Sequence, residues 1–115
     1  AAEQGKAGAQ FNLGVMYSNG EGVPQDYKTA VKWYKLAAEQ GEVKAQFNLG
    51  LRYYNGQGVP KDNVYAYMWW NIAAASGDKG ATKNRDLIAK EMTQSQIEKA
   101  QDLSRECFRK NYKGC

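Results

Sequence analysis

Apolar side chains recur at helical spacing along most of this chain. Ala30, Trp33, Tyr34, Ala37 and Ala38 stand at positions i, i+3, i+4, i+7 and i+8, which is the pattern of a helix with one buried face. Charged residues hold the opposite face of the same segment, namely Lys28, Lys32, Lys35 and Glu39. The pattern predicts an amphipathic helix, which a left-handed glycine is expected to end near Gly41.

The pattern is written twice. The hexapeptide Ala9–Gly14 returns unchanged as Ala45–Gly50, 36 positions later, and Asn19–Asp26 returns as Asn55–Asp62 with two substitutions. A fixed period of about 20–50 residues is typical of solenoids, in which each unit buries its apolar face by stacking on its neighbours. The sequence therefore favours an extended binding surface over a catalytic cavity.

Glycine and proline punctuate each unit, since Gly-x-Gly-Val-Pro can end one helix before an aspartate caps the next. We expect six main helices in three antiparallel pairs, with breaks near Gly20–Gly22, Gly41, Gly56–Gly58, Gly77 and Thr93. In the second unit the helices are expected at Val43–Asn55 and Asp62–Ser76. Thr93 and Gln96 have the spacing of a capping box, which would open the last helix.

The expected fold is an all-α solenoid in which the last helix pair forms a C-terminal cap. The chain is expected to be one domain, 1–115, with repeat 1 at about 6–41, repeat 2 at about 42–77 and capping helices at about 78–115. Ala1–Gly5 matches Ala37–Gly41, which suggests a fragment of a longer array.

The repeated residues resemble the Sel-one-like repeat (SLR) family, a relative of the tetratricopeptide repeats. The pattern Ala-x-x-x-Leu-Gly-x-x-Tyr-x-x-Gly-x-Gly-Val-x-x-Asp spans Ala9–Asp26 and Ala45–Asp62. Ala-x-x-Trp-Tyr-x-x-Ala-Ala-x-x-Gly spans Ala30–Gly41 and recurs at Ala66–Gly77, with Trp70 in place of tyrosine. The resemblance implies a right-handed α-solenoid that serves as an adaptor, without chemistry or cofactors of its own. Bacterial members of the family are frequently exported.

Composition argues against catalysis and metal binding. The chain has no histidine, and so lacks the commonest general base and the commonest zinc ligand. Its two cysteines cannot complete a usual zinc site. We therefore expect no catalytic residues, no metal and no cofactor. No apolar run is long enough to cross a bilayer. The net charge of +4 is modest, and the basic residues near the C-terminus are interpreted as a solvated helix face rather than a phosphate-binding stripe.

Cys107 and Cys115 are close enough in sequence to form a disulfide, because Asn111 and Gly114 between them can turn the chain back. Such a bridge would indicate a periplasmic, secreted or lumenal setting. Together with the family resemblance, it favours a periplasmic or secreted bacterial protein. The alternative is a reduced protein in which Cys107 is a small core residue.

One face of each first helix is the candidate partner-binding surface. In tetratricopeptide-like superhelices this face lines the concave groove, where Leu51 and Leu87 also fall. An asparagine recurs there every 36 residues, and an amide can both donate to and accept from a bound peptide backbone. The alternative is that these side chains only pack between repeats. The candidate residues are Phe11, Asn12, Phe47, Asn48, Tyr54, Asn55 and Asn84.

A possible second contact face includes Val64 and Met68. These residues stand where the first unit has Lys28 and Lys32, and exposed apolar surface usually marks a contact. Either the C-terminal tail covers this face, which we favour, or a partner or a second copy does.

The sequence thus predicts a non-catalytic scaffold that binds a partner protein or peptide, with no nucleic acid and no membrane insertion. One alternative is β-lactam binding or hydrolysis, which is linked to some cysteine-rich relatives, although no nucleophile motif is present. Another is nucleic-acid binding, in which the pairs Trp33/Tyr34 and Trp69/Trp70 would stack on bases. Their helical spacing beside Ala30 and Ala66 favours core positions instead.

Overall fold

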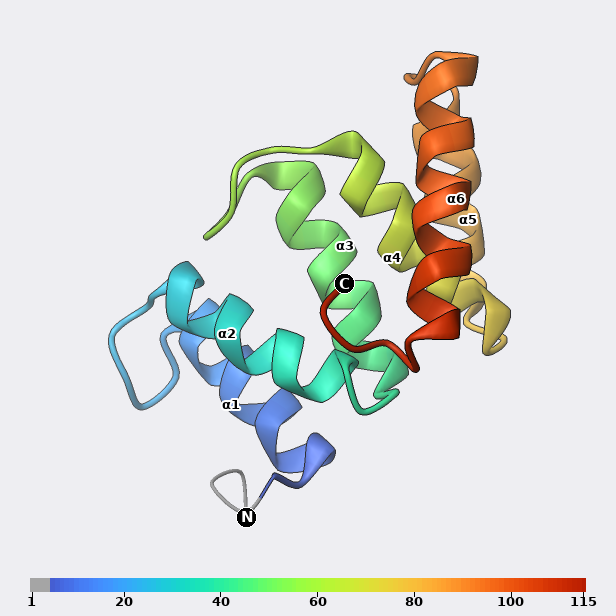
Figure 1. Ribbon diagram of the computed structural model, residues 1–115. Helices are drawn as coiled ribbons and strands as arrows, with labels where there is room; N and C mark the ends of the chain where they lie inside the picture. The colour runs from blue at the N-terminus through green and yellow to red at the C-terminus, as the bar shows by residue number, and fades with distance from the viewer. Residues whose placement is uncertain (1–4) are drawn as a thin grey trace.

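Residues 5–115 are described by a computed structural model, and in this part of the chain every regular element is an α-helix. The match between the first residues and Ala37–Gly41 falls largely on residues 1–4, outside the described part. Figure 1 shows three helix pairs that follow one another, which confirms the expected all-α solenoid. The helices are α1 (Ala7–Asn19), α2 (Tyr27–Ala38), α3 (Val43–Asn55), α4 (Asn63–Ala75), α5 (Lys79–Ala89) and α6 (Gln94–Arg109).

The helix ends have the expected chemistry. Asp26 and Asp62 accept hydrogen bonds from backbone amides in the first turns of α2 and α4. The capping box of α6 is present in full, with reciprocal hydrogen bonds between Thr93 and Gln96. Gly20 ends α1 at a φ of +70°, where a residue with a Cβ would be strained. Local sequence therefore sets where each helix begins and ends.

Each repeat closes through a glycine that faces an aromatic ring. A Cβ on Gly14 would overlap the ring of Tyr34, and a Cβ on Gly50 would overlap the indole of Trp70. The absence of a side chain lets α1 approach α2, and α3 approach α4. The buried hydroxyl of Tyr34 donates to Ser18 Oγ at 3.2 Å, and Trp70 Nε1 donates to the Phe47 carbonyl at 3.1 Å.

The first repeat exposes apolar residues that the second repeat buries. Trp33 is partly exposed, whereas its equivalent Trp69 is 1% exposed. Leu36 is 45% exposed, whereas its equivalent Ile72 is fully buried. The prediction that Trp33 is a core residue is therefore only partly right. Trp69 and Ile72 share a core cluster with residues of α2, and no described element covers α2 in the same way.

The C-terminal helix and tail cover α4. Met68 is 1% exposed and belongs to the same apolar cluster as Leu103 and Cys107. Val64 is partly buried and packs in the cluster that contains Ile97. The expectation that the chain's own tail covers this face agrees with the structure, and Met68 has no surface left for a partner.

A disulfide joins Cys107 to Cys115, with 5.6 Å between their Cα atoms. The tail that it closes returns to the first repeat, as Figure 1 shows. There Tyr112 lies against Gly41, and the Gly114 amide donates to Glu39 Oε2 at 2.8 Å. The tail thus fixes the cap to the end of α2.

Candidate functional site

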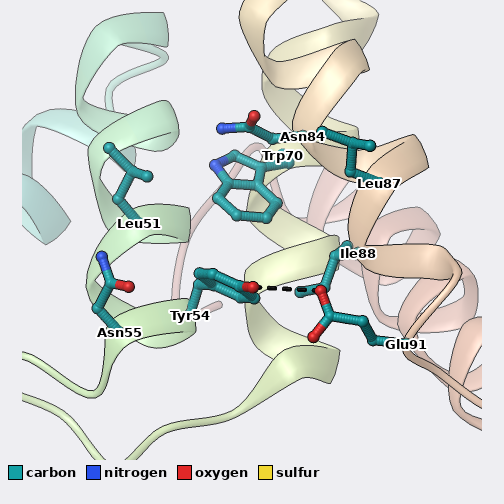
Figure 2. A pocket seen from close by; sticks show the side chains of 8 residues that line it. All are labelled: Leu51, Tyr54, Asn55, Trp70, Asn84, Leu87, Ile88 and Glu91. Carbon is teal, nitrogen blue, oxygen red and sulfur yellow. Dashed lines mark hydrogen bonds between the residues drawn. The ribbon is translucent and has the colours of Figure 1, made fainter.

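A pocket opens between α3, α4, α5 and the turn that follows α5. Its volume is about 230 Å³. Side chains from α3 and α5 form its walls and Trp70 of α4 lies between them, as Figure 2 shows. The lining residues are Leu51, Tyr54, Asn55, Trp70, Asn84, Leu87, Ile88 and Glu91.

Two aromatic rings hold the pocket in shape. The Trp70 indole is fixed by its hydrogen bond to the Phe47 carbonyl, and its ring centroid lies 5.8 Å from that of Tyr54. The Tyr54 hydroxyl donates to Glu91 Oε2 at 3.1 Å, which links α3 to the turn that follows α5. This hydrogen bond to the carboxylate raises the pKa of Tyr54 above its ordinary value.

Apolar groups dominate the remaining surface of the pocket. Ile88 is 1% exposed and lies at its base, whereas Leu87 is 49% exposed. Exposed leucine beside a concave apolar surface is a usual mark of a contact site. Burying one apolar side chain in such a site stabilises a complex by about 1.5–3 kcal/mol. The geometry is suited to holding a side chain of a partner.

Three of the sequence-predicted residues meet in this pocket. Tyr54, Asn55 and Asn84 line it together, and their role in binding stays a prediction. Three further lining residues, Trp70, Ile88 and Glu91, were missed. Trp70 was assigned to the core, where its 3% exposure does place it, but one edge of its ring still faces the pocket.

The other four predicted residues lie outside this pocket. Phe11 packs on Tyr34, with 6.0 Å between the ring centroids, and Phe47 approaches Gly80 of α5. Asn48 donates to the Lys44 carbonyl of its own helix at 2.9 Å. Of these contacts, only that of Phe47 with Gly80 joins one repeat to the next, as the alternative interpretation expects, whereas Phe11 packs within the first repeat and Asn48 bonds within its own helix. Asn12 is exposed on α1.

The corresponding position between the first two units is occupied. Arg52 stands where the next unit has Ile88, and its Nη1 donates to Ser18 Oγ at 3.1 Å. Its guanidinium carbon also lies 5.4 Å from the centroid of the Tyr27 ring. Arg52 therefore occupies at the first junction the position that Ile88 takes at the second.

Among residues 5–115, no group of three or more cysteine or acidic side chains is placed to hold a metal ion. In the same part of the chain, no helix is both long and apolar enough to span a membrane.

Comparison with known proteins gives a consistent result. The Sel1 repeat model matches residues 7–42 and 43–78. The solved structure of a protective antigen present in uropathogenic Escherichia coli strains, described as displaying an SLR fold, superposes with a TM-score of 0.91 at 36% identity. The match covers 96% of this chain and 25% of that one.

A second solved structure, a Sel1 repeat protein from Oxalobacter formigenes, has a TM-score of 0.74 at 40% identity. Here the match covers 76% of this chain and 36% of the other. This chain thus spans a quarter to about a third of the length of these relatives. The comparison with curated protein sequences gave no match. Since the family model matches both repeats and the two solved structures are 36% and 40% identical to this chain over the aligned residues, the chain belongs to the Sel1 repeat family.

Proposed function

We propose that this chain is a non-catalytic protein-interaction module that holds a segment of a partner protein in the groove between α3 and α5. The observation that supports this most is the pocket built on Trp70, since it joins an apolar base to an exposed leucine and two amides. Peptide-binding grooves use this combination, in which an apolar side chain is buried and polar groups hold the backbone.

The groove contains no obvious catalytic group. Its lining has one carboxylate, one phenol and no serine, cysteine or lysine. A β-lactam hydrolase would need a nucleophile beside a base, so the geometry favours binding over hydrolysis. Nucleic-acid binding is disfavoured as well, because Trp69 and Trp70 are almost completely buried and the groove carries a negative charge.

An exported, periplasmic or secreted location fits the disulfide, because such bonds persist in oxidising compartments. It also fits one relative that is described as a protective antigen. In this setting the chain would act as part of a scaffold that assembles other proteins.

Two matched substitutions test the groove. Leu87 and Leu36 are 49% and 45% exposed, and only Leu87 lines the pocket. Arginine at position 87 would lie one turn before Glu91 and could place its guanidinium in the pocket. Leu36→Arg makes the same change of charge and size on α2.

The immobilised chain and both variants are used to capture proteins from a native lysate, with mass spectrometry as the readout. We expect at least one protein that is recovered with the wild type and Leu36→Arg and reduced about tenfold or more with Leu87→Arg, equivalent to about 1.4 kcal/mol. Circular dichroism verifies that both variants fold. If every captured protein is insensitive to Leu87→Arg, or only Leu36→Arg reduces recovery, the groove is not the binding surface.

A further inference from the structure

The pocket has a single charged lining residue, the carboxylate of Glu91. One of its oxygens accepts from Tyr54, and within residues 5–115 no lysine or arginine forms an ion pair with it. The whole chain, in contrast, carries a net charge of +4. The groove is therefore an acidic site on a basic protein, which gives it a preference for the charge of its occupant.

The walls of the pocket complement the rest of a basic side chain. Lysine and arginine bury their alkyl stems on apolar surface and keep the charged end near polar groups. Leu51, Leu87 and the Trp70 ring supply the apolar surface, and Glu91 lies at one end of it. Aromatic faces beside a carboxylate also stabilise a cation directly.

Lys61 shows how Tyr54 interacts with a cation within the chain. Its ammonium nitrogen lies 4.4 Å from the centroid of the Tyr54 ring. Hydrogen bonds to the Tyr54 carbonyl at 2.8 Å and to Asn63 Oδ1 at 3.4 Å hold it there. Lys61 is not a lining residue of the pocket, so it leaves Glu91 without a charged partner.

Two amides flank the apolar surface on opposite helices. Asn55 belongs to α3 and Asn84 to α5, and Figure 2 shows them on either side of Trp70. Each amide can donate to and accept from a peptide backbone. A segment that crosses the groove between them would point alternate side chains toward the pocket.

From these observations we infer that the occupant is an extended partner segment that inserts one lysine or arginine side chain into the pocket, with its stem on Trp70 and Leu87 and its charge beside Glu91. The inference rests on the proposed function and names the chemistry of its partner. An acidic side chain would be repelled by Glu91. A wholly apolar one would remove water from the carboxylate without replacing it, which is unfavourable.

The probe is a displayed library of random heptapeptides, selected on the immobilised full chain and counter-selected on Leu87→Arg. We expect the peptides that depend on the pocket to be enriched in lysine or arginine next to apolar residues. A representative synthetic peptide and its norleucine analogue are then titrated against wild type and Glu91→Gln. Glutamine retains an acceptor for Tyr54, and Glu98→Gln on α6 is the control for the lost charge.

For the basic peptide, Glu91→Gln should weaken binding about fivefold, which corresponds to about 1 kcal/mol for a partly exposed ion pair. It should also reduce the salt dependence of binding. For the norleucine peptide it should have no such effect, and Glu98→Gln should change neither affinity. Pocket-dependent peptides without a basic residue, or equal effects on both peptides, would overturn the inference but leave the groove function intact. A library that yields no peptide sensitive to Leu87→Arg would overturn both.

Discussion

The two junctions between successive repeats use the same backbone plan and reach different results. At the first, Arg52 donates to Ser18, which also accepts from Tyr34, so a polar network fills the space between the helices. At the second, the equivalents are Ile88, Tyr54 and Trp70, and the pocket stays open. Helix packing is thus set by the repeated residues, whereas the shape of each junction depends on the residues that differ.

The largest expected effect on stability concerns the C-terminal tail, which joins the cap to the first repeat through its contact with Glu39. Cys115→Ser removes the disulfide and should lower the free energy of unfolding by about 2–3 kcal/mol, because a loop of this length is no longer closed in the unfolded chain. Urea denaturation followed by circular dichroism measures this difference. Lys113→Ser, in the same exposed turn, is the control. A Cys115→Ser variant as stable as the control would show that the bridge adds nothing to the fold.

Both repeats share a close packing of their two helices, which can be tested at Gly14 and Gly50. Gly50→Ala places a Cβ into the Trp70 indole and should cost about 1–3 kcal/mol of stability through overpacking. Gly14→Ala, which meets Tyr34, should cost a similar amount. Gly8→Ala is the control, because among residues 5–115 nothing outside the neighbouring backbone of α1 lies within 4 Å of the added methyl group.

In thermal melts, Gly8→Ala is expected to equal or slightly exceed the wild type, since alanine is the better helix former. If Gly50→Ala proved as benign as Gly8→Ala, the close approach of α3 and α4 within the second repeat would be wrong.

The polar filling of the first junction predicts a smaller effect. Arg52→Met removes the hydrogen bond to Ser18 and the contact with Tyr27, each worth about 0.5–1 kcal/mol. The same substitution also removes the buried Nε of Arg52, which has no hydrogen-bond partner among the described residues. Removing an unsatisfied buried polar group is favourable and offsets part of the lost stability. We expect a net loss of about 1 kcal/mol in urea denaturation. Lys44→Met, an exposed change on the same helix, should stay within about 0.5 kcal/mol; equal losses in both variants would remove the role assigned to Arg52.

The smallest effect concerns tyrosine ionisation. Burial raises the pKa of Tyr34 above its ordinary value of 10.0, while the Ser18 hydrogen bond and Arg52 oppose this shift. Because the pKa is higher in the folded chain, the stability it contributes is complete below pH 10 and is lost as the pH rises through the folded value. The thermal midpoint should therefore decrease above pH 10, and Tyr34→Phe should decrease less steeply. Identical slopes from pH 7 to 12 would assign the decrease to other groups.

Much of the fold could be predicted because its signals are local. Glycine turns, aspartate caps and the Thr93–Gln96 capping box each act within a few residues, and α3 has the predicted bounds Val43–Asn55. Burial was harder to predict where it depends on a neighbour. Gln46 is 1% exposed because its side chain donates to the Ala38 carbonyl of the preceding unit, a contact that helical periodicity does not reveal.

The candidate site was predictable only on the repeated positions. Tyr54, Asn55 and Asn84 lie on first helices whose phase follows from the 36-residue period. Ile88 and Glu91 lie beyond Arg85, where the third unit departs from the pattern. Aligning the units by their 36-residue period pairs Arg52 with Ile88. This replacement of a long polar side chain by a shorter apolar one is the sequence signal that indicates a pocket at the second junction.

The most direct test of the account asks whether a partner in the cell contacts the second junction or the first unit. The photoreactive residue p-benzoylphenylalanine is placed in separate chains at Leu87 in the second junction and at Asn12 on the first unit, and the cross-linked products are identified by mass spectrometry. The account predicts a defined partner cross-linked from Leu87, attached next to a lysine or arginine, and little or no product from Asn12. Cross-linking of the same partner mainly from Asn12, with none from Leu87, would contradict it.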